Sequence, residues 1–176
     1  MGFITPKLMT VFEIFLDDPM KERHEREVVR EAKVSKGSAN SILRKLASLG
    51  FLTRVMKGRM VFYSLNTGNP VVKQFKVLKN VYVLETLLNL LNQYSRKIML
   101  FGSCSQGTDV MESGIDLLVY SNEEDEVKKI IGDYNRGHIR KIAPIIVDAN
   151  GYIRLKREDK PLYENIERGI LLWETG

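Results

Sequence analysis

The order of the apolar patterns in the first 65 residues constrains the fold of this chain more than any other feature. Three segments with helical spacing come first, at 6–15, 22–34 and 36–49, and two short β-rich runs follow, at 51–56 and 60–65. A proline suits the first turn of the first segment, a serine caps the third, and a glycine ends it. The sequence therefore predicts three helices followed by a β-hairpin with a basic turn.

Basic residues are concentrated in the first half of the chain. The 176 residues hold 27 Lys and Arg against 22 Asp and Glu, a net charge of +5 at pH 7, yet the stretch 33–84 contains no acidic residue. Such a distribution is typical of a protein that binds a polyanion. A lysine-rich run taken alone is more often a solvated surface, so its meaning depends on the elements that carry it.

The composition argues against several classes of protein. No apolar stretch approaches the roughly 18 residues that a membrane-spanning helix needs, and the amino terminus has neither the basic segment nor the cleavage site of a secretory signal. The single cysteine, Cys104, cannot form an internal disulfide or supply the thiolates of a structural zinc site. We therefore expect a soluble, cytoplasmic protein that does not bind a membrane.

The third helical segment and the hairpin resemble those of winged helix-turn-helix transcription regulators of the multiple-antibiotic and arsenical repressor type. The resemblance depends on VSKGS at 34–38, LRKLASLGFLTR at 43–54 and GRMVFYSLN at 58–66. In that family the third helix lies in the major groove of double-stranded DNA, and the wing reaches the backbone or the minor groove. Charged side chains suit phosphates, and Asn and Ser side chains suit base edges. The candidate DNA-binding residues are Lys36, Ser38, Asn40, Ser41, Arg44, Lys45, Lys57 and Arg59.

Glycine, serine and aspartate have a definite spacing in the second half. The apolar run 97–101 ends in Gly102 and Ser103, Gly107 follows, and Asp116 stands within a second apolar run. This pattern resembles the signature of minimal nucleotidyltransferases, members of the DNA polymerase β-like superfamily. The resemblance implies an α/β domain with a mixed sheet, in which the two glycines and the serine bind the phosphates of a nucleotide.

The resemblance is incomplete where the superfamily binds its metal ions. Its members place two aspartates two residues apart on one strand, with a third carboxylate on a later strand. Asp116 occupies the second position, but the first is Gly114, and the later strand, expected at 139–147, has no acidic residue. Asp109 and Glu112, in the loop before this position, are expected to be solvated. Asp116 is thus the one candidate catalytic residue and metal ligand, and alone it would bind a metal weakly.

The chain is therefore expected to be an α+β protein of two domains. We predict a winged helix-turn-helix domain at 1–69, a connecting helix or broken pair of helices at 70–95, and a polymerase β-like nucleotidyltransferase domain at 96–176. A leucine-rich stripe along the connecting segment is expected to be core. It equally suits the seam of a homodimer that would pair two winged helices.

These resemblances favour a transcriptional regulator that binds double-stranded DNA and uses an inactive second domain as a ligand sensor or assembly module. Two alternatives remain open: a metal-dependent enzyme that transfers a nucleoside monophosphate to a protein or small molecule, and an antitoxin-like partner of a helical toxin. Gly114 discriminates between the enzyme and the regulator, because an active enzyme of this superfamily has an aspartate at that position. A regulator needs no cofactor, although a nucleotide could bind, whereas an enzyme needs Mg²⁺ and a nucleoside triphosphate.

Overall fold

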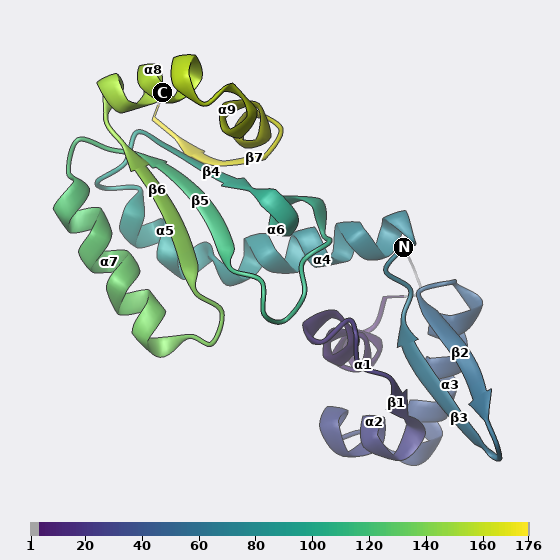
Figure 1. The fold of residues 1–176 in the computed structure, drawn as a ribbon. Coiled ribbons are helices and arrows are strands. Elements are labelled where there is room, and N and C mark those ends of the chain that lie inside the picture. Colours follow the sequence, from purple (N-terminus) through teal and green to yellow (C-terminus); the bar gives the residue numbers. More distant parts are fainter. Residues whose placement is uncertain (1–3, 176) are drawn as a thin grey trace. The chain divides into compact units, whose positions relative to one another are not determined.

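A computed structural model describes residues 4–175 of the chain (Figure 1). The chain divides into two compact units between Phe75 and Lys76, and each unit is described separately below. None of the helices within residues 4–175 combines the length and the apolar character that crossing a bilayer requires.

The first unit contains three helices and a small antiparallel sheet with strand order β1-β3-β2. The predicted helices and hairpin are all present, and the two-residue strand β1 is an addition that the sequence did not predict. Its elements are α1 (Pro6–Asp17), β1 (Arg23–His24), α2 (Glu25–Ala32), α3 (Lys36–Ser48), β2 (Leu52–Lys57) and β3 (Met60–Leu65).

Local capping and aromatic packing explain this arrangement. The Ser35 hydroxyl accepts a hydrogen bond from the Ser38 amide at 3.2 Å and begins α3 as predicted. In the core, the Phe12 ring stacks on Phe51 with centroids 5.6 Å apart and meets the edge of Phe75 at 5.3 Å. Phe12, Phe51 and Phe75 therefore form one aromatic cluster within this core.

The second unit is built on a four-stranded sheet with order β6-β5-β4-β7. Strands β5 and β6 are parallel and the other pairs are antiparallel, so the predicted mixed sheet is confirmed. Its elements are α5 (Glu85–Leu91), β4 (Lys97–Phe101), α6 (Gly102–Gln106), β5 (Ile115–Tyr120), α7 (Glu124–Gly137), β6 (Ile142–Val147), α8 (Ala149–Glu158), α9 (Lys160–Glu167) and β7 (Ile170–Glu174).

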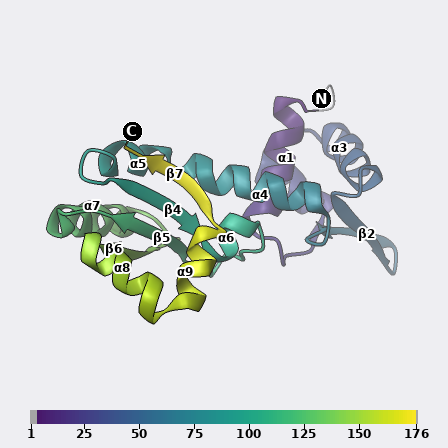
Figure 2. The same ribbon diagram turned by 90° about the horizontal axis from the view of Figure 1, so that it is seen from above.

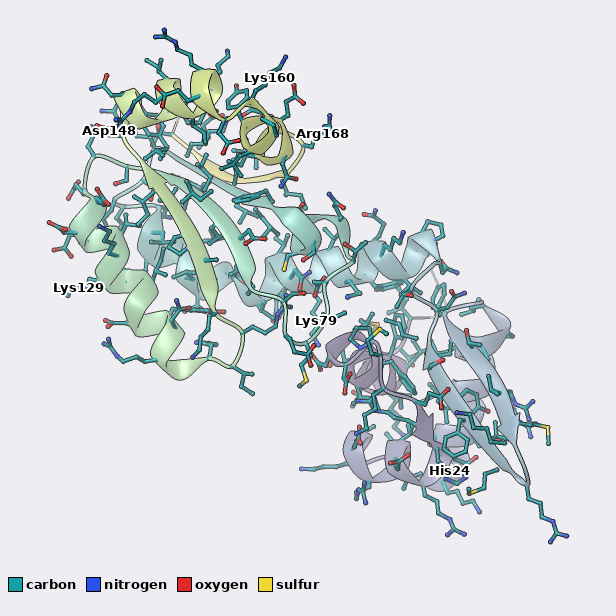
Figure 3. All side chains as sticks on the ribbon, viewed as in Figure 1. His24, Lys79, Lys129, Asp148, Lys160 and Arg168 are labelled. Carbon is teal, nitrogen blue, oxygen red and sulfur yellow. The ribbon has the colours of Figure 1, made fainter. Side chains whose placement is uncertain are left out.

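Helices cover both faces of this sheet (Figure 2). Residues of α5 and α7, including Leu87 and Ile131, pack with Leu117 on one face, while Ile166 of α9 packs with Leu118 on the other. Asp148 caps the start of α8 by accepting from the Gly151 amide at 2.6 Å (Figure 3). Helix α9 was not predicted, and the strand expected at 139–147 begins only at Ile142.

The connecting segment is a broken pair of helices, α4 (Pro70–Val83) and α5. The division between the two units falls inside α4, within the connecting segment that we predicted at 70–95. The physical reason is that Val72 and Phe75 pack in the core of the first unit, whereas Leu84 and Leu91 pack in that of the second. Leu84, Leu87 and Leu91 are buried, which confirms that the leucine-rich stripe is largely core, and its use as a dimer seam stays a prediction.

Candidate functional site

Helix α3 separates a buried apolar face from an exposed polar face. Ala39, Leu43 and Leu46 have no exposed surface and pack in the core of the first unit. The opposite face of the helix is therefore turned to solvent, as the helical period requires. The predicted DNA-binding residues that are exposed on α3 are Lys36, Ser41, Arg44 and Lys45.

Two of the predicted residues on α3 already have partners within the protein. The Ser38 hydroxyl accepts a hydrogen bond from Ser35 at 3.0 Å, so Ser38 takes part in the helix cap. Asn40 is half-buried, and its Nδ2 donates to the Glu25 carboxylate at 2.5 Å. An open hollow of about 550 Å³ lies here, lined by Glu25, Lys36, Gly37, Asn40, Ser41 and Arg44. The sequence analysis missed Glu25 because it lies on a different helix, 15 residues before Asn40.

The hairpin presents two basic residues at its tip. Lys57 pairs with Met60 across a two-residue turn. Gly58 in this turn has a φ of 62°, a left-handed backbone conformation that favours glycine. Lys57 makes an ion pair with Glu22, and its Nζ lies 5.5 Å from the centre of the Phe62 ring. Arg59 is exposed and has no ion-pair partner within residues 4–175. The charge of Arg59 is therefore the more available of the two.

The glycine turn of the second unit lies directly beside the predicted metal ligand. Strand β4 ends at Phe101, which pairs in register with Asp116 on β5. Gly102 has a φ of 67°, which favours glycine, and a Cβ there would meet Asp116 Oδ2 at the end of that side chain. Gly107 is buried, and its amide donates to the Ser103 carbonyl to end α6. The structure thus brings Gly102, Ser103 and Asp116 together, while Gly107 terminates the helix.

Asp116 is a half-buried carboxylate without a protein partner. Burial raises its pKa above the usual range, and no hydrogen bond or ion pair reaches it from the described part of the chain. The residue that pairs with Asp116 on the neighbouring strand β6 is Ala143, whose side chain supplies no metal ligand. A Cβ at Gly114 would meet the Lys141 carbonyl oxygen at 3.6 Å and Ala143 Cβ at 3.9 Å, an ordinary packing distance. The position of the missing aspartate therefore has room for a Cβ.

This arrangement does not fit the pair of divalent metal ions that the superfamily resemblance implies. Two such ions need bridging carboxylates, but the residue paired with Asp116 on β6 is Ala143, and Asp109 is already engaged in ion pairs with Lys76 and Arg140. Within residues 4–175, no group of three or more His, Cys, Asp or Glu side chains could hold a metal ion. We therefore derive no metal-dependent step for this site.

Asp109 is not the solvated loop residue that we expected. It is only 4% exposed, and its Oδ1 accepts from Asn80 Nδ2 at 2.9 Å and lies 3.4 Å from Lys76 Nζ. Arg140 Nη1 lies 3.2 Å from Asp109 Oδ2 and also donates to Asn80 at 3.0 Å. Lys76 is 3% exposed, and burial lowers its pKa in spite of the nearby carboxylate. Buried charges must be paired, and this network satisfies them.

The same network holds the turn after β4. Asn80 donates to the Cys104 carbonyl at 3.0 Å, and Arg140 Nη2 lies 2.9 Å from Cys104 Sγ. The thiol has no exposed surface, and burial raises its pKa, so it lacks the properties of a nucleophile. Cys104 is thus a small residue in a tight place, and the network fixes α6 against α4.

A family model identifies the second unit. The model described as "Nucleotidyltransferase domain" matches residues 83–171, half of the chain. The chain therefore belongs to the nucleotidyltransferase domain family. The match begins at the end of α4 and so includes α5. The domain predicted from the sequence motif began later, at residue 96.

No curated protein matches the chain, and the matches to solved structures are distant. A proposed nucleotidyltransferase from Sulfolobus solfataricus is 14% identical with a TM-score of 0.41, covering 62% of this chain and 93% of that one. A mutant of the toxin–antitoxin pair MntA–HpeT is 22% identical, with a TM-score of 0.39 and coverages of 54% and 73%. The archaeal chromatin protein TrmBL2 is 15% identical, with a TM-score of 0.32 and coverages of 91% and 72%. Because all three TM-scores are below 0.5, these likenesses do not establish a shared function.

Proposed function

We propose that this protein is a DNA-binding transcriptional regulator whose first unit is a winged helix-turn-helix. The observation that carries the proposal is α3, where exposed Lys36, Arg44 and Lys45 stand opposite a fully buried apolar face. A helix held down on one face and cationic on the other has the form that enters a major groove. The hairpin tip with Arg59 supports the same assignment, because wings contact the DNA backbone.

In this proposal the second unit keeps the nucleotidyltransferase fold without metal-dependent transfer. The support is chemical: glycine at position 114 and Ala143 beside Asp116 leave one carboxylate where the reaction needs several. Hydrogen bonds to Cys104 hold the glycine turn in place, so a nucleotide docking there without reaction would make this unit a sensor. The enzymatic alternative predicts label transfer from a nucleoside triphosphate, which variants of Gly114 and Asp116 test directly.

The proposal is tested by replacing Arg44 and Lys45 together with Ala in the full chain. Binding to mixed-sequence duplex DNA, measured by fluorescence anisotropy over a salt series, should weaken. The slope of log K against log salt should fall by roughly one unit for each phosphate that the variant no longer neutralises. Both side chains are exposed, so thermal stability should be unchanged.

The matched control removes the same charge from the second unit. Lys128 and Lys129 lie on α7 and form exposed ion pairs with Glu124 and Glu126, and Figure 3 shows Lys129 pointing away from the sheet. Changing both to Ala should leave the salt slope as it is in the natural protein. Equal losses of affinity in the two double variants would mean that binding is a general effect of net charge and would overturn the proposal.

A further inference from the structure

An acidic side chain lies inside the basic surface that we assign to DNA. Glu25, the first residue of α2, is the one acidic residue among those lining the hollow on α3, where Lys36 and Arg44 lie beside it. A carboxylate there is repelled by every phosphate of a duplex. Its presence therefore needs an explanation other than affinity for the backbone.

The contact between Glu25 and Asn40 fixes which atoms this part of the surface presents. An ionised carboxylate can only accept hydrogen bonds, so it is the amide nitrogen of Asn40 that faces Glu25, 2.5 Å from Oε2. Asn40 Oδ1 is then left as an acceptor, and no donor from residues 4–175 reaches it. Glu25 Oε1 is a second acceptor in the same position. The pair thus presents two acceptor oxygens from two different helices.

Acceptor oxygens discriminate among the edges of bases in a major groove. Adenine N6 and cytosine N4 are exocyclic amino groups that donate hydrogen bonds, whereas guanine O6 and N7 and thymine O4 are acceptors. Base pairing leaves each of these amino groups one N–H for the groove, so a single acceptor on the protein binds it, and a second acceptor beside it repels any acceptor edge, adenine N7 included. Specificity is a difference of affinities, and a repulsive group contributes to it as much as an attractive one.

We propose that Glu25 and Asn40 together form the base-discriminating element of this surface and select a base that presents an exocyclic amino group in the major groove. In this assignment Glu25 is a positioning residue as well as a reader, because it sets the orientation of the Asn40 amide. The inference rests on the DNA binding proposed above. It adds the chemical class of base that this surface selects and the two residues responsible.

The experiment selects bound duplexes from a randomised pool with the full natural chain and with two variants, Glu25→Gln and Asn40→Ala. Affinities are then measured for the preferred duplex and for duplexes changed at one base pair. In the natural protein, one position should favour adenine or cytosine on one strand by about tenfold. Glu25→Gln should bind the disfavoured duplexes severalfold more tightly, and both variants should lose most of the preference at that position.

A matched control separates the local effect from the loss of one negative charge. Glu13 is exposed on α1, does not line the hollow and has no ion pair within the part of the chain described here. Glu13→Gln should keep the preference at every position. Because glutamine preserves an acceptor and alanine suits an exposed helix, thermal unfolding should confirm that all variants are folded.

The outcomes distinguish the two proposals. If the natural chain shows no salt-dependent binding to any duplex, the proposed function itself fails. If it binds duplexes with a preference that Glu25→Gln and Asn40→Ala both retain, DNA binding stands and this inference is overturned. Binding without any sequence preference, or a preference for guanine or thymine at the position that these variants alter, would likewise overturn it.

Discussion

The charged residues of α3 in the first unit and those around Asp109 in the second unit are placed in opposite ways. In the first unit, Lys36, Arg44 and Lys45 lie exposed on one 13-residue helix, and their positions follow from the helical period of the sequence. In the second unit, Lys76 and Asp109 are buried, and the elements that join them to Arg140 are far apart along the chain. Exposed charges can be changed with little cost to folding, whereas buried charges cannot.

The largest effect that this comparison predicts is on Asp109. Asp109→Ala removes the partner of Lys76 and Arg140 and leaves the buried Lys76 ammonium unpaired. Breaking a buried pair in this way costs about 3–5 kcal/mol in the free energy of unfolding. The measurement is urea unfolding followed by circular dichroism.

The control for this prediction is Asp133 on α7, an exposed carboxylate paired with Arg136. Asp133→Ala should cost less than about 1 kcal/mol, because exposed ion pairs contribute little. If the two variants were equally stable, the network around Asp109 would not be essential to the second unit, and the contrast between buried and exposed charges would disappear.

A smaller effect is expected at two glycines with similar backbone angles in different units. Gly102 has a φ of 67° and Gly58 a φ of 62°, so alanine is strained at both. A Cβ at Gly102 would also overlap Asp116, whereas nothing lies within 4 Å of one at Gly58. Gly102→Ala should therefore cost about 2–3 kcal/mol of unfolding free energy, and Gly58→Ala about 1 kcal/mol.

A double variant separates the two causes of strain. Adding Asp116→Gly to Gly102→Ala removes the overlapping carboxylate and should return the cost to about the value for Gly58→Ala, if the backbone strain is similar at both positions. Should the double variant remain as unstable as Gly102→Ala, the overlap with Asp116 would not be the reason that glycine is needed there.

The elements that the sequence predicted well are those encoded by nearby residues. Ser35 and the apolar period after it define α3, and the run at 97–101 gives β4 with its observed bounds because Gly102 breaks the strand. Strand β1 was missed because two residues carry no pattern, and it exists only by pairing with β3. Helix α9 begins with a lysine and a proline and has no long apolar period, so its packing on the sheet decides its structure.

The candidate sites divide in the same way. The exposed cations of α3 follow from local periodicity, but the contact between Glu25 and Asn40 depends on how two helices pack. The burial of Asp109 depends on residues 29 to 33 positions away, and an acidic residue in a loop ordinarily indicates solvation. A single sequence contains no signal for such contacts, because pairings across the fold have no fixed spacing.

The last comparison concerns position 114, where one substitution tests whether the site of the second unit lacks only a carboxylate. Gly114→Asp places a carboxylate beside Ala143, the residue on β6 that pairs with Asp116. The Cβ of the new side chain fits at position 114. Two carboxylates there should bind Mn²⁺ or Mg²⁺ at least about tenfold more tightly than the natural chain, by calorimetry. Gly114→Asn, which has the same shape without the charge, should not.

The same proteins are then incubated with each labelled nucleoside triphosphate, the metal ion and a set of protein and small-molecule acceptors. The natural chain should transfer no label, because catalysis by metal ions requires ligands that position them against the developing charge. Transfer by the natural chain that Asp116→Ala abolishes would overturn the proposed loss of activity and make the protein an enzyme. Transfer by Gly114→Asp alone would show that the glycine turn and Asp116 still form a competent site and that the absence of one carboxylate is what silences it.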